Sequence, residues 1–117
     1  KGPRFRGEVV VLIGPTNSSA TFQFASLMQT NGLARLVGGP TGGNQRGING
    51  GAFFFLRLPA SGLEADLPLI GRFPLSPQPN EGLAPNVFVE DTAADIAAGR
   101  DRVMIAALQA LGVSPPP

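Results

Sequence analysis

A short, uninterrupted apolar run near the start of the chain limits the possible folds more than any other feature. Residues 9–13 read VVVLI, and Gly14 and Pro15 end the run. A continuous run of β-branched and aliphatic residues is typical of a strand buried on both faces, as in a parallel sheet. Such a strand has a neighbour on each side, so we expect further strands of the same sheet to come from protein outside this chain.

The residues after this run predict a helix and then a second strand. Residues 19–31 are typical of a helix, with apolar side chains around most of its circumference, so we expect it to be deeply buried. Thr16, Asn17 and Ser18 are candidate N-caps. Residues 34–38 form the next strand, which makes a parallel strand–helix–strand unit with a right-handed crossover.

The middle of the chain predicts a loop followed by a hairpin. Residues 38–51 are rich in glycine and predict a loop. Residues 52–58 and 63–70 flank a Pro-Ala-Ser-Gly turn and predict two antiparallel strands, and Pro68 indicates an edge position. The three consecutive phenylalanines at 53–55 are interpreted as core, with at least one of them facing a partner.

The C-terminal part predicts an extended path over residues 71–85, a strand at 86–90 and two helices. Thr92 and Asp95 have the spacing of a capping box for the first helix, which Gly99 closes. Residues 101–111 carry an apolar stripe typical of an amphipathic helix. The fold class is therefore α/β, with a linker at 1–7, a domain portion at 8–113 and a tail at 114–117.

Composition excludes several classes of function. Charged residues make up 15% of the chain, below the roughly 25% of globular domains, so we expect some of its surface to be covered by more protein. There is no basic stripe for nucleic acid and no apolar run long enough to span a membrane. Cysteine and histidine are absent, which excludes a thiol nucleophile, and we expect no metal site and no cofactor.

The turn between the first strand and the helix is the candidate site. Ser19 stands at the first turn of the predicted helix, where backbone N–H groups are unpaired and the helix dipole is positive. This position favours a developing oxyanion and suits a serine nucleophile. The alternative is that Ser18 and Ser19 are only helix caps.

Several segments resemble the C-terminal-processing (tail-specific) serine peptidases and their tricorn-core relatives, a family with a VVVL strand, a T-x-S-A turn, a Q-D-N-G-R-A helix end and a following VGE-T-FGKG. The corresponding stretch here is VVVLIGPTNSSATFQFASLMQTNGLARLVGGPTGGNQRG, over residues 9–47. The resemblance continues in the hairpin, in EGLAPNV at 81–87 and in DIAAGRD at 95–101. It implies the C-terminal part of a crotonase-like or ClpP-like α/β domain.

The resemblance also implies roles for individual residues. Ser19 is the nucleophile, and the N–H of Ala20 is one donor of the oxyanion hole, with a second donor from a glycine-rich segment upstream. One branch of the family uses a Ser–Lys dyad, but Asn44 stands at that lysine position. The other branch uses Ser–His–Glu, and here Glu81 is the nearest candidate for the acid. The alternative is that Glu81 is a solvated loop carboxylate.

Other positions refine this interpretation. Glu64 and Asp66 are alternatives to Glu81. Gly42, Gly43 and Asn44 are candidates for a wall of the substrate groove, where small residues let a peptide approach closely. Residues 52–58 are also a candidate for pairing with an extended substrate. Phe22 and Gly39 stand where the family has acidic residues, which marks a divergent member.

We therefore expect part of a serine endopeptidase whose general base lies outside this chain, since a serine hydroxyl needs such a base to attack an amide. The chain alone is then inactive, and its partners are a peptide or protein substrate, the upstream part of the same protein and a possible second copy. The resemblance implies a periplasmic, envelope or secreted location. The alternative is a family relative that kept the fold as a binding or structural module and lost the chemistry.

Overall fold

The computed structural model describes residue 2 and residues 4–114, so Lys1, Pro3 and most of the predicted tail lie outside the described residues. The chain forms two compact units. The first comprises residues 1–42 and 82–117, and the second comprises residues 43–81.

A three-stranded parallel sheet forms the centre of the first unit. Its strands are β1 (Val10–Ile13), β2 (Arg35–Gly38) and β5 (Val87–Phe88), in the order β1-β2-β5. β1 and β2 pair in parallel from Val10 opposite Arg35 to Ile13 opposite Gly38. The helix α1 (Ser19–Thr30) connects them, so the predicted strand–helix–strand unit is confirmed.

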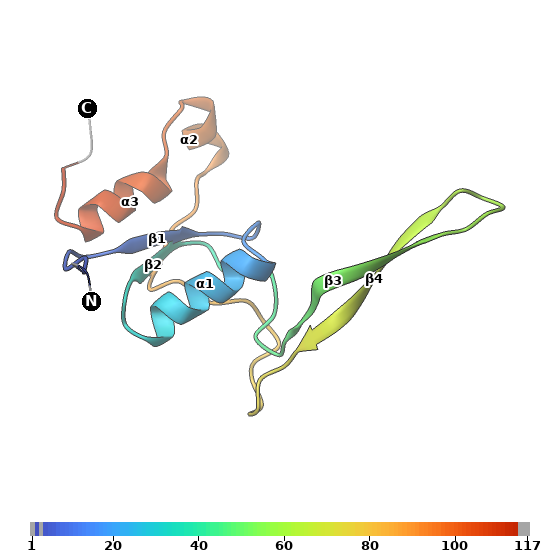
Figure 1. The fold of residues 1–117 in the computed structure, drawn as a ribbon. Helices are drawn as coiled ribbons and strands as arrows, with labels where there is room; N and C mark the ends of the chain where they lie inside the picture. Colours follow the sequence, from blue (N-terminus) through green and yellow to red (C-terminus); the bar gives the residue numbers. More distant parts are fainter. Residues whose placement is uncertain (1, 3, 115–117) are drawn as a thin grey trace. The chain divides into compact units, whose positions relative to one another are not determined.

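Helices lie on both sides of this sheet. Figure 1 shows α1 on one side of the strands and α3 (Arg102–Ala110) on the other. The buried cluster toward α1 consists of Ile13, Ala25, Leu36 and Leu83. On β2 the residue after Leu36 points to the opposite face of the sheet. There Val37 is fully buried, and Ala107 of α3 is 5% exposed. Alternation along a single strand thus divides the core between two helices.

The deep burial predicted for α1 is wrong for this chain. Ala25 is its buried residue, whereas Phe24 and Leu27 are 54% and 62% exposed. The described residues cover only the face of α1 that meets the sheet. A helix that is apolar around most of its circumference, but covered on one side, leaves a second apolar face open to solvent.

Side chains shape the C-terminal part of the first unit. The predicted strand at 86–90 is reduced to Val87–Phe88. Just before it, the side-chain oxygen of Asn86 accepts the Leu36 N–H at 2.7 Å. The short helix α2 (Ala93–Ala97) begins with the predicted capping box, in which Thr92 and Asp95 each bond the other's backbone N–H. The predicted helix caps at this end of the chain are therefore confirmed.

The second unit is a hairpin of β3 (Ile48–Arg57) and β4 (Glu64–Arg72). The predicted glycine-rich loop is shorter than expected, because β3 already begins at Ile48 and runs through Gly50 and Gly51. The register is irregular between Gly50 and Phe53. Gly51 lies in this bulge with a φ of 85°, a conformation that glycine adopts without steric cost. A bulge thus lets a glycine-rich segment remain part of a strand.

The interpretation of residues 53–55 as core is wrong for this chain. Phe53, Phe54 and Phe55 are 47%, 55% and 67% exposed. No residue of the second unit is buried. A two-stranded sheet has no second layer of its own to cover either face, and such a hairpin is marginally stable at best in water.

Candidate active site

The turn before α1 is held by one asparagine. The side-chain oxygen of Asn17 accepts the Gly14 N–H at 2.8 Å, and the Asn17 N–H donates to the Gly14 carbonyl at 2.9 Å. These two bonds close the turn between β1 and α1. Sequence reasoning treated Asn17 only as a candidate helix cap. The signal for its actual role is an asparagine placed a few residues after the end of a strand, where its side chain can bond nearby backbone.

Ser19 has an unusual backbone conformation at the end of this turn. Its φ is 53°, and among the described residues it is the only non-glycine residue with a positive φ. For a residue with a Cβ this conformation costs about 1–3 kcal/mol. Such strain persists where the surroundings impose it, and it concentrates at functional sites. The conformation therefore sets Ser19 apart from an ordinary first helical residue.

The serines at this turn do not act as side-chain caps. Ser18 occupies the N-cap position with extended backbone, and its side chain makes no capping hydrogen bond. Instead its carbonyl accepts the N–H groups of Thr21 and Phe22, at 3.2 and 3.4 Å, and the Thr21 hydroxyl at 2.8 Å. The Ser19 hydroxyl makes no hydrogen bond to another described residue. The observed geometry therefore does not support the view that these serines only cap the helix.

The first N–H groups of α1 remain available. With Thr21 and Phe22 bonded to Ser18, the N–H groups of Ser19 and Ala20 have no partner among the described residues. Both residues are exposed, and the first turn of α1 contains no acidic side chain. The Ala20 N–H thus lies next to the Ser19 side chain at the positive end of the helix dipole, where an oxyanion is stabilised.

Gly42 packs directly against this turn. A Cβ on Gly42 would clash with the Pro15 carbonyl oxygen and would approach the Asn17 carbonyl oxygen. Just before it, buried Thr41 exchanges hydrogen bonds with Leu83: its N–H donates to the Leu83 carbonyl, and its hydroxyl accepts the Leu83 N–H at 2.8 Å. The glycine predicted as a groove wall therefore lies in the same unit as Ser19, at the turn that presents it.

Gly43, Asn44 and Glu81 belong to the second unit. Asn44 has a structural role there, because its side chain donates to Asn80 at 2.7 Å and accepts the Arg46 N–H at 2.8 Å. The Glu81 carbonyl accepts the Gln45 N–H, and its exposed carboxylate makes no hydrogen bond or ion pair with another described residue. The structure thus groups Ser19, Ala20 and Gly42, and it places the three other candidates at the base of the hairpin.

The alternative acids lie on β4 of the hairpin. Glu64 is 3.9 Å from Arg57 across the two strands. Asp66 stands opposite Phe55 and is exposed. These positions are those of carboxylates on a solvated strand.

The structure also bears on ligand and membrane binding. Within residues 4–114, no group of three or more histidine, cysteine, aspartate or glutamate side chains is placed to hold a metal ion. None of the helices in this part of the chain is long and apolar enough to cross a membrane.

A cavity of about 470 Å³ lies around the amino-terminal ends of β1 and β2, lined by Glu8, Gln29 and Arg35 among others. Ser19 follows the opposite, carboxyl end of β1, so this cavity includes no residue of the candidate site.

Comparison with protein families supports a peptidase relationship for the part of the chain that contains this turn. A family model described as peptidase family S41 matches residues 1–52, which include β1, α1, β2, Ser19 and Gly42. None of the curated proteins matches the sequence. The match supports the S41 peptidase family and, with it, a peptidase-related function and a serine peptidase class of hydrolase.

Proposed function

We propose that this chain is part of a serine endopeptidase and that Ser19 is its nucleophile. The observation that carries the proposal is the backbone of Ser19. A positive φ holds an unbonded hydroxyl at the start of α1, beside the unpaired N–H of Ala20. The peptidase family match over residues 1–52 supports the same reaction class.

In the proposed reaction, the Ser19 oxygen attacks the carbonyl carbon of a peptide bond, and its proton passes to a general base. The Ala20 N–H donates to the oxyanion that forms on the carbonyl oxygen. The base returns the proton to the leaving amine, which leaves an ester on Ser19. Water then attacks this ester, releases the new carboxyl end and restores the Ser19 hydroxyl.

The general base comes from protein outside this chain. The chain contains no histidine, and its single lysine is Lys1. Asn44 stands where the Ser–Lys branch has its lysine, and an amide cannot accept the serine proton at neutral pH. The proposal is therefore a Ser–His–Glu arrangement in a crotonase-like or ClpP-like domain, with Glu81 as the candidate acid. By the same resemblance, the proposed location is the periplasm, the envelope or the exterior.

Peptide hydrolysis by the complete gene product tests this proposal. Ser19→Ala is expected to lower kcat at least about 1,000-fold, whereas Ser18→Ala, which removes the neighbouring hydroxyl, retains activity. Circular dichroism confirms that both variants fold. Hydrolysis that is unchanged in folded Ser19→Ala contradicts the proposal. If the complete gene product folds and binds peptides without cleaving them, the result supports the alternative of a binding module that has lost catalytic activity.

A further inference from the structure

The β3–β4 hairpin has two faces of different chemistry. Residues directly opposite each other in an antiparallel pair share a face. On one face the pairs are Phe53 with Pro68, Phe55 with Asp66 and Arg57 with Glu64. On the other face the pairs are Phe54 with Leu67, Leu56 with Ala65 and, joined by the Leu58 N–H to the Leu63 carbonyl, Leu58 with Leu63. We call this second set, with Leu69, the apolar face.

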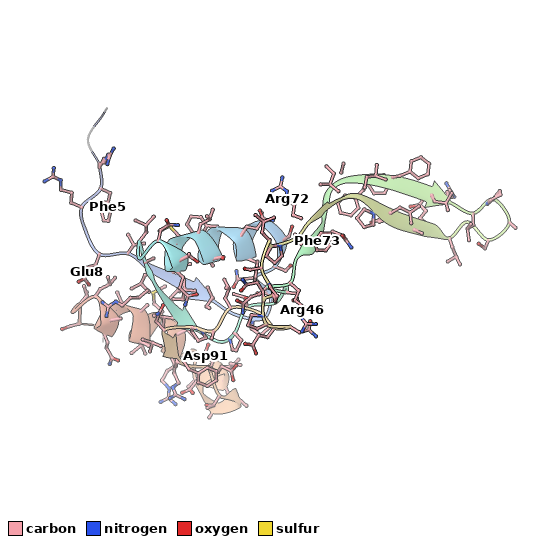
Figure 2. The ribbon with its side chains drawn as sticks, turned by 90° about the horizontal axis from the view of Figure 1, so that it is seen from below. Phe5, Glu8, Arg46, Arg72, Phe73 and Asp91 are labelled. Atoms are coloured by element: carbon pink, nitrogen blue, oxygen red, sulfur yellow. The ribbon has the colours of Figure 1, made fainter. Side chains whose placement is uncertain are left out.

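None of the seven residues of the apolar face has a polar or charged side chain, and Asn49, opposite Gly71, is a polar residue on the same side at the base of the hairpin. Because side chains alternate between the two faces along each strand, the charged residues all lie on the other face. They are Arg57, Glu64, Asp66 and Arg72. That face therefore mixes charged and apolar side chains: Arg57 lies near Glu64, and Phe53 and Phe55 stack on each other with ring centroids 6.4 Å apart. Figure 2 shows side chains extending from both sides of the ribbon.

The side chains of the apolar face are exposed. Leu63 and Leu69 are each 65% exposed, Phe54 is 55% exposed, and Leu56, Leu58 and Leu67 are 40–45% exposed. At roughly 150–250 Å² for a large side chain, the six present on the order of 500–700 Å². The largest apolar patch on a typical monomer is about 300–600 Å² and is often functional. Two such faces together present about 1,000–1,400 Å², which lies above the roughly 1,000 Å² in total that a specific interface needs.

We infer that the apolar face is an interface between two copies of this chain, packed face to face around a two-fold axis. A two-fold interface places the same surface on both partners. A face without charge meets itself without like-charge repulsion, and without leaving a buried charge unpaired. Permanent homodimer interfaces have this apolar composition. Such packing also gives the hairpin the second layer that it lacks within its own unit. The inference does not depend on the proposed peptidase function.

Cross-linking in the complete gene product tests this inference. The chain has no cysteine of its own, so single cysteines report on one face at a time, after any cysteine elsewhere in the gene product is replaced by serine. Leu67→Cys lies on the apolar face, and Asp66→Cys, one residue away, lies on the other face. Under mild oxidation, Leu67→Cys is expected to give a covalent dimer, and Asp66→Cys is expected to remain monomeric on a non-reducing gel.

Sedimentation adds a measurement that needs no cross-link. The parent is expected to sediment as a dimer, and Phe54→Asp is expected to raise the dimer Kd by at least about 30-fold, the effect of an interface hot spot. Phe53→Asp, on the other face, is expected to leave the Kd unchanged. A folded parent that is monomeric at micromolar concentration overturns the inference, because the rest of the polypeptide or a different protein then covers this face. Equal cross-linking of both cysteine variants overturns it as well.

Discussion

The two units of this chain differ in how far their apolar side chains are buried. In the first unit, β1, β2, α1 and α3 bury residues such as Leu36 and Val37 completely. In the second, strands that contain Phe53, Phe54 and Phe55 bury none of their residues. Hydrophobicity therefore does not decide burial by itself. A sheet needs a second layer, and only the first unit supplies one from its own sequence.

Close backbone contacts occur in both units. In the first unit, a Cβ on Gly38, Gly42 or Gly82 would clash with the carbonyl oxygen of Ile13, Pro15 or Thr41, respectively. In the hairpin, a Cβ on Gly47 would clash with the Arg72 carbonyl oxygen, whereas Gly50 has open space in the corresponding direction. The unit that contains the candidate nucleophile is thus closely packed at its backbone, as positioning of a strained residue requires.

Truncating one leucine in each unit should give the largest difference in the free energy of unfolding. Leu36→Ala removes a side chain with no exposed surface, so it is expected to lower the free energy of unfolding by about 2–5 kcal/mol. Leu69→Ala, at 65% exposure, is expected to change it by less than about 0.5 kcal/mol in the monomeric chain. Urea unfolding measures both. Equal losses contradict the distinction between the units.

Adding a methyl group tests the backbone contact near the site. Gly82→Ala is expected to destabilise the chain by about 1–3 kcal/mol, because its Cβ meets the Thr41 carbonyl and backbone must shift. Gly50→Ala is the matched control, since its Cβ meets nothing. The same urea titration measures the two variants. A Gly82→Ala protein as stable as Gly50→Ala contradicts the described packing.

Relieving the strain at Ser19 should give a smaller effect of the opposite sign. Glycine adopts a positive φ without the steric cost of a Cβ, so Ser19→Gly is expected to be about 1 kcal/mol more stable than Ser19→Ala. Both variants lack the hydroxyl, so neither is expected to hydrolyse peptides. Thermal unfolding of the pair measures the difference. If Ser19→Ala is the more stable variant, the positive φ is not a feature of the folded protein.

The smallest expected effect depends on pH. Hydrogen bonds from the Thr92 side chain and backbone, with Arg100 and Arg102 nearby, hold the pKa of Asp95 below its ordinary value of 3.8. A lowered pKa in the folded state stabilises the protein above the unfolded pKa, and this contribution is lost as the pH falls below it. The unsubstituted protein is therefore expected to have a higher Tm than Asp95→Asn at pH 6, and this difference in Tm should shrink below about pH 3.8. A Tm difference that grows as the pH is lowered contradicts a lowered pKa of Asp95.

Local patterns in the sequence predicted much of the fold. The Thr92–Asp95 spacing and the turn at 59–62 each determine structure through neighbouring residues, and both were interpreted correctly. The run at 9–13 forms the predicted strand β1, but its predicted burial on both faces is wrong for this chain: β1 is an edge strand of the described sheet, and Leu12 is 37% exposed. Burial was not predictable in this way. Phe24 and Phe54 have the sequence signature of core residues, but whether they are covered depends on protein that approaches from elsewhere.

The candidate site was predictable in part. The position of Ser19 at a strand–helix turn follows from the sequence, but its positive φ does not, because serine rarely adopts it. Nor does the sequence reveal that Gly42 touches the turn, since that contact joins segments more than twenty residues apart. The sequence likewise does not reveal that the side chain of Asn44 donates a hydrogen bond to Asn80, since the two residues are far apart in the chain.

Active-site labelling with a fluorophosphonate, followed by mass spectrometry of the digested complete gene product, tests the central claim most directly. The account predicts one adduct, on Ser19, which persists in Ser18→Ala and disappears in Ser19→Ala. An adduct on another residue, or a folded gene product with no adduct at all, contradicts the assignment of Ser19 as an activated nucleophile.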